Sequence, residues 1–241
     1  MAKKGGHKKA LWIVLLSAVL ILALVFILYH AVYYHADETA KRYMQSDEKV
    51  AVRETGYGWL FDGPSEDTAL IFYPGAKVEE TAYAPLLHRL AEQGIDVCLV
   101  KLPLRIAFYK MNAADAVLKE HTYSRWYIGG HSLGGLIASA YAADHPDVFK
   151  GVILIGAYPM KAIPEPLSET LITGSNDGVV NWDSIDKWRS QSPSDYFEYN
   201  IEGGNHAQFG SYGVQKGDGT AKISTEEQVE ETVRIIVNRI R

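Results

Sequence analysis

A serine lies between two glycines in the middle of the chain, at a spacing that suits a reactive nucleophile. The motif Gly130-x-Ser132-x-Gly134 follows the apolar run 126–128 and precedes a helical pattern at 133–143. A strand that turns into a helix within a few residues holds such a serine in a strained conformation with its hydroxyl exposed. The two glycines fit because side chains at their positions would collide in so tight a turn. The motif therefore predicts that Ser132 is a nucleophile.

A serine hydroxyl is a weak nucleophile near neutral pH, so it needs a histidine base, which in turn needs an orienting carboxylate. After a strand–serine–helix motif the order along the chain is serine, acid, histidine. Only His145 and His206 follow Ser132. His145 comes so soon after the helix that no acid at a strand end fits before it. We therefore predict that the base is His206, in a glycine-rich loop after the apolar run 197–201.

The orienting acid should end a strand between the serine and the histidine. The run 170–173 leads into a polar turn that contains Asp177. Asp183 and Asp186 fall in the next helical pattern, 182–189, where an exposed helix face accommodates them. Aspartates are common in turns for backbone reasons alone, but the place of Asp177 at a strand end makes it the predicted acid.

Two backbone N–H donors are needed to stabilise the oxyanion of a tetrahedral intermediate. Leu133 supplies one, because its N–H lies at the N-terminus of the predicted helix, where negative charge is favoured. The loop after the run 69–73 supplies the other: Gly75 allows close approach of the backbone, and Ala76 is the predicted donor. Lys77, which follows, either contacts substrate or is simply solvated.

The chain around these residues alternates between apolar runs and helical patterns. The runs lie at 50–53, 69–73, 96–100, 126–128, 152–155, 170–173 and 197–201, and the helical patterns lie at 83–93, 113–119, 133–143, 182–189 and 225–241. Strands separated by helical patterns of about 10–15 residues are typical of βαβ units with a parallel sheet covered on both faces. The predicted fold class is therefore α/β, with the functional residues in loops beyond the carboxyl ends of the strands. Cys98 falls in a predicted buried strand and has a packing role.

The first nine residues hold four lysines and no acid, although the formal charge of the 241-residue chain is −5. A net-negative body argues against nucleic acid as a partner, because phosphates demand a basic face. Residues 11–29 are apolar except for Ser17, and at 1.5 Å per residue they extend roughly 28 Å, close to the hydrocarbon core of a bilayer. A cleaved signal peptide and a buried soluble helix are the alternatives to a membrane anchor. The anchor is favoured because a signal peptide has a shorter apolar run followed by small residues.

These patterns predict four segments. They are a basic cytoplasmic tail at 1–10, a transmembrane anchor at 11–32, a linker or stalk at 33–49 and a folded domain at 50–241. Because positive charge stays on the cytoplasmic side of a membrane, the N-terminus is expected in the cytoplasm and the domain outside the cell membrane.

The segments 73–77, 130–135, 173–177 and 203–206 together resemble the α/β-hydrolase superfamily, in its small, cap-less fold-5 or dienelactone-hydrolase-like branch. The resemblance covers about residues 50–241, and it implies an eight-stranded, mostly parallel sheet with Ser132, Asp177 and His206 as the catalytic triad. Dienelactone hydrolases use a cysteine nucleophile, whereas this chain has serine. Only residues 156–168 separate the two strands between which many relatives insert a lid, so an open site is expected, lined by Tyr158 and Phe209.

The expected activity is hydrolysis of carboxylic esters, from small molecules or lipids, through an acyl-enzyme. The same triad would also serve an acyltransferase that acts on lipid or envelope substrates. A third alternative is a non-catalytic binding module, because a fold does not dictate a function. No metal or organic cofactor is expected, because no cysteine or histidine–carboxylate cluster has the spacing of metal ligands.

Overall fold

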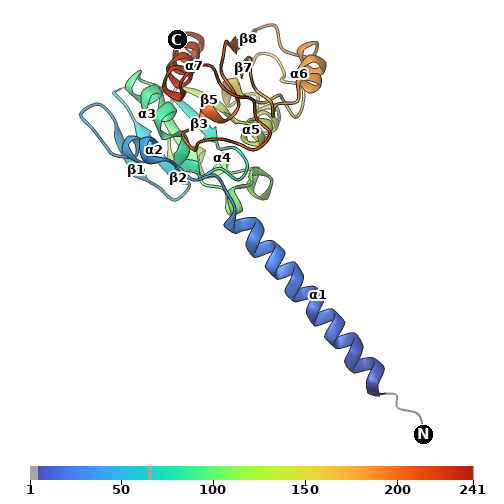
Figure 1. The fold of residues 1–241 in the computed structure, drawn as a ribbon. Helices are drawn as coiled ribbons and strands as arrows, with labels where there is room; N and C mark the ends of the chain where they lie inside the picture. The colour runs from blue at the N-terminus through green and yellow to red at the C-terminus, as the bar shows by residue number, and fades with distance from the viewer. Residues whose placement is uncertain (1–4, 65–66, 241) are drawn as a thin grey trace. The chain divides into compact units, whose positions relative to one another are not determined.

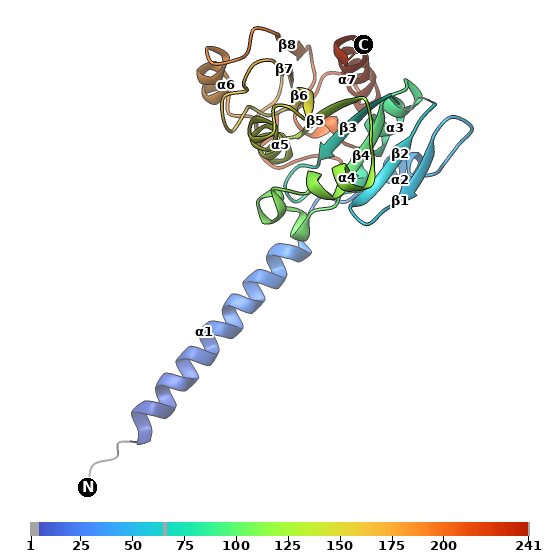
Figure 2. The ribbon, with the colours of Figure 1, turned by 180° about the vertical axis from the view of Figure 1, so that it is seen from behind.

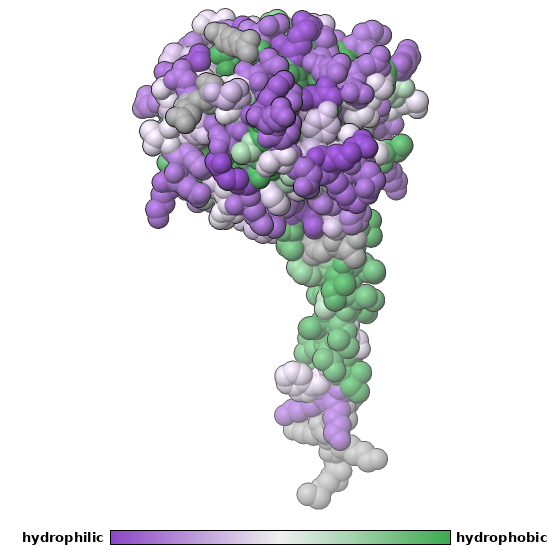
Figure 3. Space-filling view, turned by 90° about the vertical axis from the view of Figure 1, so that its left-hand side faces the viewer, coloured by the Kyte–Doolittle hydropathy of each residue, from purple (hydrophilic) through white to green (hydrophobic). Residues whose placement is uncertain are grey.

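The computed structural model describes residues 5–64 and 67–240, and the chain divides into two compact units, Met1–Tyr33 and Tyr34–Arg241. The first unit contains the helix α1 (Gly5–Ala31). Its stretch Lys8–Tyr29 is 22 residues long and apolar enough to cross a membrane. Every side chain of this stretch is exposed, and Figure 3 shows an apolar surface along most of it. At 1.5 Å per residue the stretch measures about 33 Å, enough for a hydrocarbon core of about 30 Å.

An eight-stranded sheet forms the centre of the second unit, with the strand order β1-β2-β4-β3-β5-β6-β7-β8 (Figure 1). Strands β3 to β8 are parallel, and β2 is antiparallel to both β1 and β4. The strands are β1 (Ala51–Glu54), β2 (Gly58–Asp62), β3 (Thr68–Tyr73), β4 (Asp96–Val100), β5 (Arg125–His131), β6 (Phe149–Ile155), β7 (Ser168–Gly174) and β8 (Tyr196–Ile201). The predicted α/β class and the mostly parallel sheet are confirmed.

The sequence interpretation missed β2. This strand is five residues long and lies between Gly56 and Gly63-Pro64, which by themselves indicate turns. It forms an antiparallel hairpin with β1, and its other edge pairs with β4. The pairing partners, rather than its own short pattern, make it a strand.

Helices cover both faces of the sheet, as Figures 1 and 2 show from opposite sides. The helices of the second unit are α2 (Glu38–Tyr43), α3 (Ala84–Glu92), α4 (Ala114–Glu120), α5 (Leu133–Asp144), α6 (Trp182–Arg189) and α7 (Thr225–Ile240), with short 3-10 turns η1 (Glu80–Tyr83), η2 (Pro103–Arg105), η3 (Ala107–Lys110) and η4 (Ala207–Phe209). One apolar cluster lies under α2, α3 and α7, and a second lies under α4, α5 and α6. Strand β3 feeds both: Leu70 and Phe72 join the first cluster and Ile71 joins the second. This alternation follows from the two-residue period of a strand that is buried on both faces.

The segment 33–49, predicted as a linker or stalk, belongs to the second unit from Tyr34 onward. Ala36 and Ala40 are buried in the core, and Asp37 caps α2 by accepting a hydrogen bond from the Ala40 N–H (2.9 Å). Tyr34 forms a β-bridge with Val78. The polar residues of this short helix resemble a solvated linker in sequence, but Ala40 within the helix and Ala36 just before it are small apolar side chains that the rest of the unit buries.

Candidate active site

Ser132 lies at the junction of β5 and α5 with φ 53° and ψ −126°. A positive φ is uncommon for a residue with a side chain, and such strain is found where a site requires it. A Cβ on Gly130 or Gly134 would lie 2.3 or 2.2 Å from the carbonyl oxygen of Tyr73. The close approach of β3 to this turn therefore requires both glycines. The turn has the geometry that the motif predicts.

His206 and Asp177 meet on the same side of the sheet edge, from the loops that follow β8 and β7. The Nδ1–H of His206 donates to Oδ2 of Asp177 at 2.8 Å, and both side chains are buried. Oδ1 of Asp177 accepts the backbone N–H groups of Val179 and Val180, each at 2.8 Å. The carboxylate is thus fixed by its own loop and points its second oxygen at the imidazole.

Gly156, directly after β6, makes room for this pair. Its φ is +52°, and a Cβ built on it would lie 2.9 Å from Nδ1 of His206 and 3.3 Å from Oδ2 of Asp177. Sequence reasoning missed this glycine, although its position at the carboxyl end of a predicted strand was the available signal.

Asp218 connects the acid loop to the histidine loop. Its carboxylate accepts the backbone N–H groups of Gly178 (3.1 Å), His206 (3.2 Å), Ala207 (2.8 Å) and Gly219 (2.8 Å). These bonds hold the residues that follow Asp177 and the backbone of His206 to one carboxylate.

Gln228 fixes the histidine loop from the side of α7. It is fully buried, accepts the N–H of Asn205 at 3.0 Å and donates to the C=O of Asn205 at 2.7 Å. Asn205 immediately precedes His206, so α7 sets the path of the chain into the imidazole. Neither Gln228 nor Asp218 belongs to a local motif, and sequence reasoning found neither.

The loop after β3 lies against the start of α5. A Cβ on Gly134 would lie 2.5 Å from the carbonyl oxygen of Pro74, which brings residues 74–76 beside Leu133. Within residues 5–64 and 67–240, the backbone N–H groups of Ala76 and Leu133 make no hydrogen bond. The two predicted oxyanion donors thus belong to neighbouring segments and are available to a ligand.

A buried tyrosine–histidine pair supports this loop. The Tyr83 hydroxyl accepts the N–H of Gly75 (3.0 Å) and donates to Nδ1 of His131 (2.8 Å). Burial, and then the charge of neighbouring His206, lower the pKa of His131 well below its ordinary value, so this ring stays neutral. The centroids of the two imidazole rings are 4.3 Å apart. His131 therefore packs against His206 as an uncharged ring.

A small cavity of about 210 Å³ opens at this place. Of the predicted site residues, Ser132, Leu133, His206 and Tyr158 line it. The other lining residues, which sequence reasoning missed as such, are Leu136, Gly156, Val179, Val180 and Asn181. Residues 156–167 form a loop without a helix, which agrees with the expected open site.

Phe209 does not line this cavity, contrary to the prediction. It is 1% exposed in the apolar core, and its ring lies 5.8 Å from that of His131. The η4 turn after His206 directs Phe209 inward. The histidine that the order of residues rejected, His145, is exposed at the end of α5, and Asp183 and Asp186 are exposed on α6, as expected.

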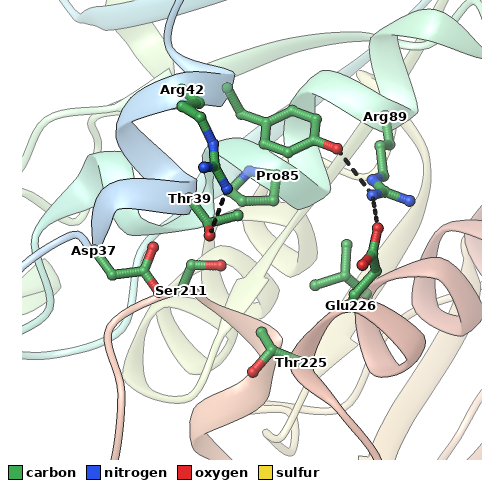
Figure 4. A pocket seen from close by; sticks show the side chains of 10 residues that line it. Asp37, Thr39, Arg42, Pro85, Arg89, Ser211, Thr225 and Glu226 are labelled. Carbon is green, nitrogen blue, oxygen red and sulfur yellow. Dashed lines mark hydrogen bonds and ion pairs between the residues drawn. The ribbon is translucent and has the colours of Figure 1, made fainter.

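Two other groups of polar residues lie apart from the catalytic candidates. A cavity of about 300 Å³ between α2, α3 and α7 contains Arg89, which bonds to Tyr43 and Glu226 (Figure 4). Elsewhere, ligand atoms of Asp47, His88 and Glu92 lie within 4.8 Å of one another, a grouping that the spacing in the sequence did not indicate. Asp47 faces Nε2 of His88 at 3.5 Å and Glu92 faces Nδ1 at 3.9 Å. The two carboxylates approach different nitrogens of one imidazole ring.

Comparisons with known proteins agree with this architecture. The model of the alpha/beta hydrolase family matches residues 69–230. No curated protein sequence gives a significant match. Many solved structures match the fold.

A putative hydrolase from Agrobacterium vitis S4 is 12% identical, with a TM-score of 0.62 over 80% of this chain and 100% of the other. Est1E from Butyrivibrio proteoclasticus is 14% identical, with a TM-score of 0.57 over 80% and 99%. MGS-MChE2, an alpha/beta hydrolase enzyme from the metagenome of lagoon sediments at Mar Chica, Morocco, is 16% identical, with a TM-score of 0.58 over 78% and 96%.

At these low identities the solved structures show a shared fold. The family model covers the segment that contains Ser132, Asp177 and His206. The chain is a hydrolase that belongs to the alpha/beta hydrolase family.

Proposed function

We propose that this chain is a membrane-anchored serine esterase with Ser132 as nucleophile, His206 as general base and Asp177 as orienting acid. The observation that carries the proposal is that His206 donates its Nδ1–H to Asp177 at 2.8 Å while it lines the same cavity as Ser132. With the proton on Nδ1, the Nε2 atom is left as a proton acceptor. It has no hydrogen-bond partner among the described residues, so it is available to the serine.

In the first half of the reaction, Oγ of Ser132 attacks the ester carbonyl carbon while Nε2 of His206 takes the hydroxyl proton. The negative charge moves to the carbonyl oxygen, where the N–H groups of Ala76 and Leu133 would stabilise it. Collapse of this intermediate breaks the bond to the alkoxy group, which leaves as an alcohol with the proton from His206. Asp177 stabilises the imidazolium in between.

In the second half, a water molecule attacks the carbonyl carbon of the acyl-serine while His206 takes a proton from the water. The bond to Oγ of Ser132 then breaks, the carboxylic acid leaves, and His206 returns the proton to Oγ. Two features support water over another acceptor. The loop 156–167 supplies no lid, and the 210 Å³ cavity is smaller than the ~300–1,000 Å³ of pockets that enclose a whole ligand. Water therefore reaches the acyl-enzyme, and the site holds the reacting end of an ester while the rest extends outward. The structural relative Est1E has been seen with ferulic acid bound, a carboxylic acid and thus of the product class expected here.

The membrane anchor is the stretch Lys8–Tyr29. Its exposed apolar side chains have no cover within the described first unit. Two lysines precede the stretch and two more begin it, with no acid among the first nine residues. By the positive-inside rule the N-terminus lies in the cytoplasm and the hydrolase unit outside it. Bulky residues at 32–34 disfavour cleavage as a signal peptide. Carbonate extraction of membranes tests the anchor, and protease access to a C-terminal tag in intact cells tests the orientation; a protected tag contradicts the orientation.

The catalytic proposal is tested with a fluorophosphonate probe, which reacts with activated serines. We expect Ser132→Ala to abolish labelling and hydrolysis of p-nitrophenyl esters. Ser190→Ala serves as the control, because this serine is exposed at the end of α6. Folded protein that the probe fails to label, or that remains labelled in Ser132→Ala, contradicts the proposal.

A further inference from the structure

The segment 101–111 after β4, called here the β4 loop, exposes large apolar side chains. Leu104, Phe108, Tyr109 and Met111 are 40%, 50%, 60% and 39% exposed. Leu104 has a φ of 55° and Arg105 a φ of 56°, so the backbone is held in an unusual path while these side chains point outward. Single exposed apolar residues are normal, but a contiguous group marks an interaction site.

Basic side chains lie among these apolar ones. A cavity of about 390 Å³ beneath the loop is lined by Lys101, Arg105 and Lys110 together with Leu104. The one acidic residue in its lining is Glu80, which lies 3.9 Å from Nζ of Lys101. Three cations against one carboxylate leave the cavity net positive, in a body that is otherwise negative. Aromatic and basic residues on one surface are typical of proteins that sit at a lipid headgroup layer.

The backbone ties this loop to the point where the hydrolase unit begins. The N–H of Lys77 donates to the C=O of Arg105 (2.9 Å), and the C=O of Lys77 accepts the N–H of Tyr34 (2.7 Å). Tyr34 is the first residue of the second unit, and the apolar stretch ends at Tyr29. At ~3.3–3.6 Å per residue, the intervening chain allows at most about 17 Å between them. The chain therefore tethers the hydrolase unit to the apolar stretch by at most this length.

We propose that the β4 loop docks on the surface of an anionic phospholipid bilayer. Phe108 and Tyr109 enter the interfacial layer, while Lys101, Arg105 and Lys110 contact the phosphates of the headgroups. The inference rests on the anchor of the proposed function and adds an orientation to it. Ser132 and the β4 loop both follow carboxyl ends of parallel strands, so docking turns the cavity toward the bilayer. The esters that meet the site are then those that partition into the interface.

The test uses the full chain in vesicles, with a reporter fluorophore on one engineered cysteine. Cys98 does not compete for the label, because it is buried and burial raises the pKa of its thiol to about 12. Met111→Cys places the reporter at the edge of the β4 loop and leaves Phe108 and Tyr109 in place. Val148→Cys, 37% exposed at the amino end of β6, is the matched control. In vesicles of phosphatidylcholine with phosphatidylserine, nitroxide-labelled lipids should quench position 111 at least about threefold more than position 148.

A second arm tests the charges. Lys101→Gln with Lys110→Gln should weaken docking by roughly fivefold per lysine on phosphatidylserine vesicles and leave it unchanged on phosphatidylcholine alone. Lys119→Gln with Lys150→Gln removes the same charge from exposed positions elsewhere and should have no effect. Equal quenching at 111 and 148 in chain that resists carbonate extraction overturns the docking proposal. Chain that carbonate extracts overturns the anchor instead, and hydrolysis of a soluble ester in detergent reports on the catalytic proposal separately.

Discussion

The hydroxyl of Tyr83 lies 2.8 Å from Nδ1 of His131, the residue directly before the proposed nucleophile. The same hydroxyl accepts the N–H of Gly75, the residue directly before the proposed oxyanion donor Ala76. One buried side chain therefore links the turn that carries Ser132 to the loop that would hold the oxyanion. The N–H of Gly75 is used in this way, whereas the N–H of Ala76, the proposed donor, has no hydrogen-bond partner among the described residues.

Tyr83→Phe should loosen this link. The change leaves the N–H of Gly75 and Nδ1 of His131 buried without a partner, which costs about 1–3 kcal/mol of stability. We expect kcat for a p-nitrophenyl ester to fall about tenfold with little change in KM, less than the 10²–10³ that loss of a whole oxyanion donor costs. The control is Tyr57→Phe, which breaks a similar bond, to His121 at 3.0 Å. If the two variants lose stability and kcat alike, Tyr83 has no positioning role.

Gly156→Ala should disable the acid–base pair. The new Cβ would press on His206 and Asp177, and the φ of +52° adds strain. We expect kcat to fall by about 10² or more, because a displaced imidazole no longer meets both partners. Gly213→Ala has a comparable φ of +81° in open space, so it reports the cost of strain alone and should keep its kcat. Steady-state kinetics and thermal unfolding of both variants give the comparison, and a fully active Gly156→Ala contradicts this view of the pair.

Asp218→Asn should uncouple the acid loop from the histidine loop. The amide nitrogen of asparagine cannot accept the N–H of Ala207 or an equivalent donor, so at least one of the four bonds becomes a repulsion. We expect about 1–2 kcal/mol lower stability and about tenfold lower kcat, with fluorophosphonate labelling of Ser132 slowed in proportion. Asp183→Asn, on the exposed face of α6, is the matched change. If the rate of labelling is unaltered in Asp218→Asn, the loops after β7 and β8 position His206 without the Asp218 carboxylate.

Glu169 gives the chain a pH dependence that is independent of catalysis. Burial raises the pKa of this carboxyl to about 7, and Glu198 adds to the rise while Ser192 opposes it. The unfolded chain releases the proton near pH 4.5 but the folded chain holds it, so stability is fullest below about pH 4.5 and falls as pH rises to about 7, by about 3 kcal/mol.

Glu169→Gln removes this titration. Its Tm should exceed that of the parent chain at about pH 8, with the difference narrowing toward about pH 5. Glu202→Gln, an exposed change after β8, should leave the profile as it is. A gap in Tm that does not depend on pH refutes the assignment.

Local sequence patterns were enough to predict Ser132, Asp177 and His206. The elbow is a five-residue motif whose glycines are required by contacts within the turn and with β3, and the order of serine, acid and histidine selected Asp177 and His206 among few alternatives. The strands β3 to β7 are nearly all buried on both faces, and their continuous apolar runs made them predictable. These features are visible in sequence since each depends on neighbours in the chain.

The residues that sequence reasoning missed depend on distant partners. Gln228 reaches Asn205 from 23 positions away, and Asp218 reaches Gly178 from 40. Phe209 has the type of a substrate-lining residue, and only the η4 turn decides that it faces the core. The spacing of residues in the sequence does not predict such contacts, because they form where loops that follow different strands meet at one edge of the sheet.

The backbone pairing of Tyr34 limits where the chain can be cut without damage. Its N–H and C=O are bonded to Lys77 and Glu79, beside the loop that carries Ala76. Proteolytic cleavage within residues 30–33 would release a unit in which Tyr34 keeps its backbone hydrogen bonds to Lys77 and Glu79. A cut a few residues later would remove Tyr34 and leave the C=O of Lys77 and the N–H of Glu79 open to water. A fragment released in this way loses the backbone support of the loop 74–77 together with its tether.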